Sequence, residues 1–257
     1  MLCAFFLLAV APVSAEEGLR ESTAEWTVMW YGLGDNNLDE LLVRSINSLE
    51  TVGSSDDVKI IAQIDRLSTG VATRYYITYD SEYEINSQSI ASLGSIDSTD
   101  PRYLQEFILS VASDYPAKHY ALILSNHGGG ILRGFGTDDS QYGNGLNVEE
   151  IDHALGESGV HFDLIGFEAC LMATIGVAHQ LAEHSDYMVF SQDVIYGWGN
   201  SYELFLSKLV DSPSVDGRQL ATWIVEDYAR WWDHWWQFPP PDGTIISAID
   251  LTRVQDL

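Results

Sequence analysis

Two short stretches of the chain carry residues that could perform covalent chemistry. The apolar run LILSN ends at His127, which three glycines follow, and a second run, FDLIGFEA, ends at Cys170. A thiolate attacks a carbonyl carbon once a neighbouring base has taken its proton, and an imidazole suits that role. Gly128 would let the backbone approach a substrate closely, so that its N–H and that of Cys170 stabilise an oxyanion. The structural alternative is a histidine in a turn and a cysteine packed in the core.

The expected fold would bring these residues together. Short apolar runs predict buried strands, and segments with apolar residues at helical spacing between them predict helices. Strands are expected within 25–33, 58–65, 73–80, 83–90, 119–126, 162–169, 186–193 and 243–250, the third and fourth as a hairpin or two short strands. Helices are expected within 38–49, 100–115, 147–155, 171–184 and 217–236, and loops within 128–145 and 194–202.

This order of elements indicates an α/β fold with a mostly parallel sheet and helices on both faces. Ligands bind such sheets beyond the carboxyl ends of the strands. Asp35, Asp65, His127, Cys170 and Asp193 all follow or end expected strands. We therefore expect them on one rim of the molecule, with His127 beside Cys170 if their strands are neighbours.

Composition and the amino-terminal residues limit the expected partners and the expected location of the protein. The formal charge is −26, so phosphate would be repelled and nucleic acid is not an expected partner. The acidic surface suits either high salt or cationic substrates. Residues 1–15 are typical of a secretory signal cleaved after Ala15, although a basic start is missing, and an uncleaved membrane anchor is the alternative. No later stretch predicts a membrane span.

Removal of the signal would take Cys3 with it and leave Cys170 as the remaining cysteine of an exported chain. A lone thiol cannot form an internal disulfide, which favours a chemical role. We expect one domain over 16–257, either truncated at the carboxyl end or closed there by a short helix, and the sequence does not indicate an oligomeric state.

Four motifs together are similar to those of a known family. WTVMWYGLGDNNLDE, LILSNHGGG, GFEACLMA and TIISAIDL resemble, in this order, the clostripain family of cysteine peptidases, from about Trp26 onward. The family belongs to the caspase-like group with the gingipains and legumains. The resemblance implies a caspase-like α/β/α sandwich and a catalytic dyad, His127 and Cys170, that cleaves peptide bonds after arginine or lysine through a thioacyl-enzyme.

The same resemblance suggests which residues bind the substrate. The family usually has an aspartate two residues before the nucleophile, to pair with the basic P1 side chain, whereas this chain has Glu168. Glu168 could instead face solvent or cap the next helix. Asp193 is a second candidate for the P1 pocket, with an ordinary turn residue as the alternative. Some members cut themselves between the catalytic residues, and Arg133 is a basic residue in that loop.

No cofactor is required by this interpretation, but calcium is possible. Some members of the family depend on calcium, and the segment GTDDSQYGNG offers oxygen ligands without the spacing of an EF-hand. A metal hydrolase is not favoured, because His179 and His184 are five residues apart and do not share one helical face. The rival to a protease is a catalytically silent acidic domain that keeps the fold and binds cationic peptides.

Overall fold

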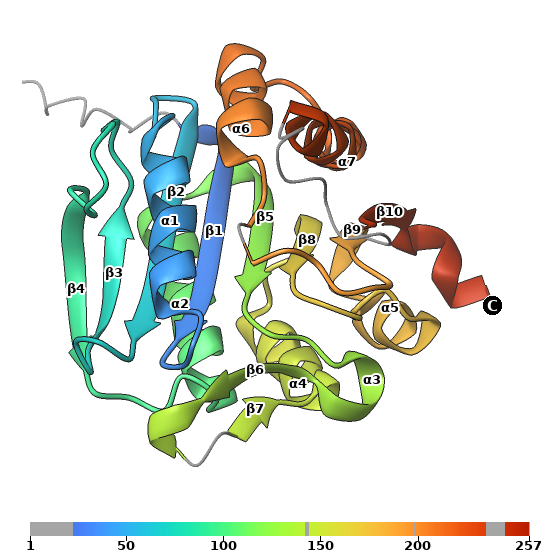
Figure 1. Cartoon of the computed structure of the whole chain (residues 1–257). Coiled ribbons are helices and arrows are strands. Elements are labelled where there is room, and N and C mark those ends of the chain that lie inside the picture. The colour runs from blue at the N-terminus through green and yellow to red at the C-terminus, as the bar shows by residue number, and fades with distance from the viewer. Residues whose placement is uncertain (1–22, 142–143, 198, 235–244, 257) are drawn as a thin grey trace, which may run out of the picture.

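The computed structural model describes residues 23–141, 144–197, 199–234 and 245–256 (Figure 1). An 8-stranded sheet runs in the order β10-β9-β8-β5-β1-β2-β3-β4. The central strands from β9 to β2 are parallel, and β10, β3 and β4 are antiparallel to their neighbours. The bounds are β1 Ala24–Gly34, β2 Val58–Arg66, β3 Ala72–Tyr76, β4 Gln88–Gly94, β5 Ala117–Ser125, β8 Phe162–Glu168, β9 Ser185–Phe190 and β10 Ser247–Asp250.

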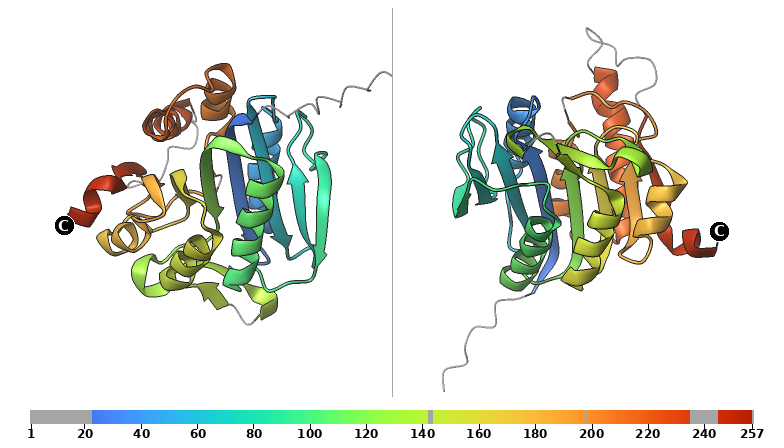
Figure 2. Two further views of the ribbon diagram at one scale, coloured as in Figure 1. Left: turned by 180° about the vertical axis from the view of Figure 1, so that it is seen from behind. Right: turned by 90° about the horizontal axis from the view of Figure 1, so that it is seen from below.

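Helices cover both faces of this sheet (Figure 2). One face packs against α1 (Asp39–Glu50), α6 (Tyr202–Asp211) and α7 (Gly217–His234). The other packs against α2 (Pro101–Asp114), α4 (Val148–Ser158), α5 (Ile175–Leu181) and the 3-10 helix η2 (Leu251–Asp256). The expected α/β/α sandwich with a mostly parallel sheet is therefore confirmed.

Alternation along β1 explains why the sheet has two hydrophobic cores. Successive side chains of a strand point to opposite faces. Trp26, Val28 and Trp30 accordingly belong to the core under α1, α6 and α7. Met29 and Tyr31 belong to the core under α2, α4 and α5. A strand buried on both faces reads as a continuous apolar run, as β1 does.

The register of the parallel strands brings their carboxyl ends to one rim. Ser125 at the end of β5 is opposite Glu168 at the end of β8. Gly34 of β1 is likewise opposite Arg66 of β2. The loops that follow these strands therefore start at the same level, which confirms the expected rim.

The segment 128–145 differs from the expected loop. It contains the short helix α3 (Gly130–Arg133), the 3-10 turn η1 (Asp139–Gln141) and two antiparallel strands, β6 (Phe135–Asp138) and β7 (Asn144–Leu146). We call the β6–β7 pair the arm. Its glycines lower the strand propensity of the sequence, so the arm was not predicted. Glycine is nevertheless favoured at Gly134 and Gly136, because their φ angles are 72° and 80°.

Two helices also differ from expectation. The sequence did not lead us to expect α6, although its buried residues have helical spacing. The helix expected from Leu171 begins at Ile175, because Thr174 caps it by accepting a hydrogen bond from the amide of Val177. The caps expected at Asp100 and Asn147 are both present.

Some expectations lie outside the described residues. The proposed signal, residues 1–15, and residues 235–244, which include the last two positions of the helix expected within 217–236, belong to ranges that the structure does not describe. Among the helices it does describe, none combines the length and the apolar character needed to cross a bilayer.

Candidate active site

His127 follows β5 and is held by its neighbours at the rim. Its amide donates to Oδ1 of Asn126, and its carbonyl accepts from the amide of Gly136 at 2.8 Å. The imidazole Nε2 lies 2.8 Å from Oδ1 of Asn37, in the loop after β1. Burial lowers the pKa of His127, and the negative charge of Asp139 opposes this effect. The imidazole therefore favours its neutral form, in which one ring nitrogen can accept a proton.

Cys170 occupies the corresponding place after β8. It is two residues beyond the paired position Glu168, just as His127 is two residues beyond Ser125. The thiol is free and partly exposed, and the amide of Ile195 donates to Sγ at 3.4 Å. Sγ in turn donates to the carbonyl of Ile195 at 3.9 Å, so both backbone groups of this residue contact the sulfur.

One cavity at the rim joins the two side chains. His127 and Cys170 both line it, and its volume is about 220 Å³. Over the described residues no hydrogen bond joins the imidazole to the sulfur, since Nε2 is directed to Asn37. Catalytic hydrogen bonds are often longer in the free enzyme and tighten with substrate, so this arrangement is compatible with a dyad.

Gly128 packs closely against the loop that carries Cys170. It faces Phe135 in an isolated antiparallel bridge, whose hydrogen bonds run from Gly136 to His127 and from Gly129 to Gly134. The amide of Gly128 is thus in a non-hydrogen-bonded pair and is not used by this bridge. A Cβ at Gly128 would lie 2.1 Å from the carbonyl oxygen of Cys170, so this close approach requires glycine.

The residue after Cys170 has a strained backbone. Leu171 has φ of 62°, and no other described residue except glycine has positive φ. A left-handed conformation costs a residue with Cβ roughly 1–2 kcal/mol. The amide of Leu171 donates to the carbonyl of Asp193 at 3.2 Å, which holds the turn. Such strain concentrates at functional sites, and here it sets the direction in which the backbone leaves Cys170.

Glu168 forms the polar floor of the cavity. Its side chain is 5% exposed, and Oε2 accepts from the hydroxyls of Ser125 at 2.5 Å and Tyr202 at 2.8 Å. Oε1 accepts from the amide of Asn200 at 2.6 Å. These donors are neutral, so none of them would offset the charge of an ionised Glu168. Burial raises the pKa of Glu168, and these hydrogen bonds oppose the effect only in part.

Apolar residues form the walls between this floor and the mouth. Leu38, Leu41 and Leu42 contribute from the start of α1, and Val194 to Tyr196 contribute from the loop after β9. Gly199 has φ of 83°, and a Cβ there would lie 2.5 Å from Oε1 of Glu168. Glycine thus lets this loop pass directly over the carboxylate. The cavity combines apolar walls with an acidic floor, which matches a long aliphatic side chain ending in a cation.

The structure places the other candidate differently. Asp193 is exposed, does not line the cavity, and directs Oδ1 to the amide of Val194 at 2.7 Å. The structure brings together four of the expected site residues: His127, Gly128, Cys170 and Glu168. Asp193 contacts this group only through its carbonyl, which accepts from the amide of Leu171.

Sequence reasoning missed several residues around the site. Asn37 lies two residues after Asp35, which was expected on the rim, so the position of Asn37 could have been predicted. The partners of Glu168 could not, because Tyr202 lies 34 positions later in the chain.

Comparisons with known proteins identify the class to which this fold and site belong. The sequence model of the Peptidase C11 family, described as the clostripain family, matches residues 30–257. The chain belongs to the clostripain family. It is 31% identical over 221 residues to clostripain from Hathewaya histolytica, a match that covers 71% of this chain and 42% of that protein. The chain thus spans about two fifths of the length of this curated relative.

Solved structures support the fold. A secreted C11 cysteine protease from Bacteroides thetaiotaomicron, bound to an irreversible peptide inhibitor, superposes with a TM-score of 0.75 at 23% identity, covering 90% of this chain and 67% of that one. An inactive zymogen of a C11 protease from Parabacteroides distasonis gives 0.73 at 21% identity, covering 91% and 64%. At these identities the likeness shows the fold alone, and it agrees with the expected caspase-like sandwich.

Proposed function

We propose that this chain is a cysteine endopeptidase that cleaves peptide bonds after arginine or lysine. One observation supports it above the others: a buried carboxylate, Glu168, floors a cavity that His127 and Cys170 also line. A basic P1 side chain that reaches Glu168 would leave its own carbonyl at the mouth of the cavity, next to the sulfur.

The reaction follows from these groups. His127 takes the proton of the Cys170 thiol, and the thiolate sulfur forms a bond to the P1 carbonyl carbon. The amides of Gly128 and Cys170 donate to the resulting oxyanion, and loss of one such donor costs about 3 kcal/mol. The tetrahedral intermediate collapses as His127 returns the proton to the leaving amine and the C–N bond breaks. Water, deprotonated by His127, then hydrolyses the thioacyl-enzyme and restores the thiol.

Charge and shape support the specificity for a basic P1 residue. The methylene groups of arginine or lysine would lie along Leu38, Leu41 and Ile195, while the cation pairs with Glu168. An ion pair in a buried site strengthens binding and excludes neutral side chains, because they would leave the carboxylate without a partner. The two basic side chains remain alternatives, since a guanidinium can pair in two places and an ammonium in one.

We also propose that the protein is exported. The support is the signal-like sequence of residues 1–15 and the strongly acidic composition, which keeps a chain soluble outside the cell and attracts cationic substrates. The domain would then begin after Ala15.

An irreversible probe tests this function directly. An arginyl acyloxymethyl ketone should modify wild type at Cys170, and Cys170→Ala should prevent labelling while still binding arginine-containing peptides. A lysyl probe used in parallel measures the preference between the two side chains. Failure of both probes, together with retained binding of basic peptides by wild type, would instead establish the catalytically silent binding domain.

A further inference from the structure

An exposed apolar surface lies beside the catalytic residues, outside the cavity that holds Glu168. It consists of large apolar side chains from α3, from the turn after Cys170 and from the first position of α5. These residues, which we call the apolar patch, are Ile131, Leu132, Leu171 and Ile175, and they are 43%, 93%, 41% and 61% exposed. None of the four lines the cavity that holds Glu168. Exposed apolar side chains that lie together often mark a binding surface, whereas isolated ones are ordinary.

Packing of α3 against the chain after Cys170 makes the patch one surface. The helices α3 and α5 contact each other and lie side by side in Figure 1. A Cβ at Gly176 would lie 3.2 Å from Cγ1 of Ile131, and a Cβ at Gly130 would lie 2.9 Å from the carbonyl oxygen of Leu171. The helix that follows the catalytic histidine therefore rests on the segment that follows the nucleophile.

The backbone of Leu171 indicates that its side chain has a function. Its φ of 62° lies in the left-handed region, which glycine adopts readily and leucine does not. A buried leucine could recover this cost through packing in the core, but Leu171 is exposed. Strained residues concentrate at ligand-binding sites, so a strained and exposed leucine next to the nucleophile points to a contact with substrate.

The patch leads into a second cavity. Ile175 lines this cavity, whose volume is about 290 Å³, between the start of α5 and the strands β9 and β10. Most of its lining residues are apolar, among them Ala173, Phe190 and Ile249, and none of the described residues that line it is charged. Ala173 is three positions beyond Cys170, so their Cα atoms are at most about 11 Å apart, a distance that about three residues of an extended peptide span.

The proposed reaction determines which part of a substrate would meet this surface. His127 returns its proton to the leaving amine, so the substrate residues after the scissile bond begin at His127. The helix α3 starts three positions after His127, and Leu171 directly follows Cys170. The P1 side chain occupies the separate cavity that Glu168 floors. The peptide after the scissile bond would therefore pass over the apolar patch toward the second cavity.

We propose that the apolar patch and the second cavity bind the first three substrate residues after the scissile bond, P1′ to P3′, and favour apolar side chains there. This preference rests on the peptidase activity proposed above and narrows the substrates to chains in which apolar residues follow the basic one. An apolar side chain that covers the patch removes both surfaces from water, which is the source of the preference.

Quenched fluorescent peptides with arginine at P1 test the preference. The reference peptide has leucine at P1′, P2′ and P3′, and three further peptides replace one of these leucines by serine. Leucine should raise kcat/KM about tenfold over serine in at least one position. Arginyl aminomethylcoumarin, which has no residue after the scissile bond, measures the rest of the reaction separately.

Variants of the patch connect the preference to these residues. Leu132→Ser and Ile175→Ser should each lower the leucine-to-serine ratio by about threefold or more, since each removes part of the apolar contact. Leu109→Ser, at a leucine of α2 that is 43% exposed, is the control and should keep the wild-type ratio. Leu171→Asn should lower the ratio without lowering the melting temperature, because asparagine adopts positive φ more readily than leucine. A merely structural leucine predicts a lower melting temperature and an unchanged ratio.

Acyl transfer measures the same surface without a peptide on the leaving side. With an arginine ester as donor, the amine of leucinamide attacks the thioacyl carbonyl in place of water. The C–S bond breaks, and the amine proton passes through His127 to the sulfur. Leucinamide should compete with water several times better than serinamide does, and Leu132→Ser should reduce this advantage.

The two levels of the proposal fail in different ways. Equal kcat/KM for leucine and serine at all three positions, or a ratio that Leu132→Ser and Ile175→Ser leave unchanged, would overturn the proposed surface while arginyl aminomethylcoumarin is still cleaved. Absence of cleavage of every substrate, the coumarin included, would overturn the peptidase function itself and this inference with it.

Discussion

Oδ1 of Asn37 lies 2.8 Å from Nε2 of His127. If Nε2 carries the proton and donates it to Asn37, Nδ1 is left as the acceptor for the thiol of Cys170. Asn37 comes from the loop after β1, and β1 pairs with β5, the strand that His127 follows. In that tautomer Asn37 would hold the plane of the imidazole without lining the cavity.

Replacement of Asn37 should lower turnover and leave binding unchanged. We expect Asn37→Ala to reduce kcat about tenfold or more with little change in KM, because the imidazole loses its orientation. Asn37→Asp should restore the orientation and move the acid limb of the pH profile upward, since a carboxylate favours imidazolium. Asn86→Ala, at an exposed asparagine, is the control. A change in KM alone would contradict a positioning role.

The pH dependence of kcat/KM should report the environment of His127. An imidazole that has gained a proton cannot accept one from the thiol, so activity falls as pH falls through its pKa. Because burial lowers the pKa of His127, the midpoint should lie below the usual value of about 6.5. Asp139 opposes this lowering, so Asp139→Asn should move the midpoint to still lower pH, more clearly at low salt. An upward movement would rule out this assignment.

Glu168→Gln should raise the free energy of unfolding and lower the activity. Burial raises the pKa of Glu168 in the folded chain, so its ionised form destabilises the fold at neutral pH. We expect the neutral variant to gain about 1 kcal/mol in the free energy of unfolding near pH 7–8. The gain should shrink as pH falls, because wild-type Glu168 then becomes protonated as well. Urea denaturation at several pH values measures this difference.

The same substitution should abolish the recognition of a basic P1 residue. Loss of a buried partner costs about 2–5 kcal/mol, so kcat/KM on arginyl substrates should fall at least 30-fold. Glu157→Gln, at an exposed glutamate of α4, should change neither property. Unchanged cleavage after arginine by Glu168→Gln would show that the P1 side chain binds elsewhere.

Gly128→Ala should damage both the fold and the site. The added Cβ would lie 2.1 Å from a backbone oxygen of Cys170, so the two loops must separate. We expect a loss of about 1–3 kcal/mol in unfolding free energy, as for other overpacked positions, and little remaining activity. The control is Gly156→Ala within α4, whose Cβ would meet its nearest neighbour at 3.5 Å. It should gain about 0.5–1 kcal/mol and keep full activity.

The sequence predicted the strands that carry the site because each is a buried apolar run ending in polar residues. It therefore placed His127 and Cys170 on one rim, and the register of β5 and β8 confirms their proximity. It missed α6 although Tyr202, Phe205, Leu206 and Leu209 are buried at helical spacing, so the signal was present. The arm of β6 and β7 gave a weaker signal, since its strands have only four and three residues.

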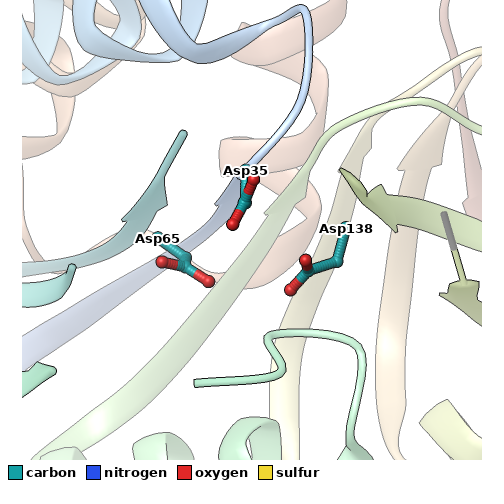
Figure 3. Close-up of side chains that lie close together, drawn as sticks. All are labelled: Asp35, Asp65 and Asp138. Carbon is teal, nitrogen blue, oxygen red and sulfur yellow. The ribbon is translucent and has the colours of Figure 1, made fainter. Parts of the chain in front are cut away.

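The surroundings of the acidic residues could not be predicted from local patterns. Alternation along β8 directs Glu168 to the face of the sheet opposite that of Phe167. Its hydrogen-bond donor Tyr202, however, comes from α6, which is distant in the sequence. Asp35 and Asp65 were expected on the rim, whereas their convergence with Asp138 (Figure 3) depends on how the arm folds back. Contacts between remote segments require the tertiary structure, because nothing in the adjacent sequence specifies them.

The turn at Leu171 ties the reactive sulfur to the wall of the cavity. Asp193 accepts from the amide of Leu171, and Ile195, two residues further on, donates to the sulfur and lines the cavity. A side chain that fits badly against Ile195 would shift the thiol as well as bind weakly. Discrimination between correct and incorrect peptides should consequently appear in the rate of acylation, and a poor substrate held at saturating concentration would still be cut slowly.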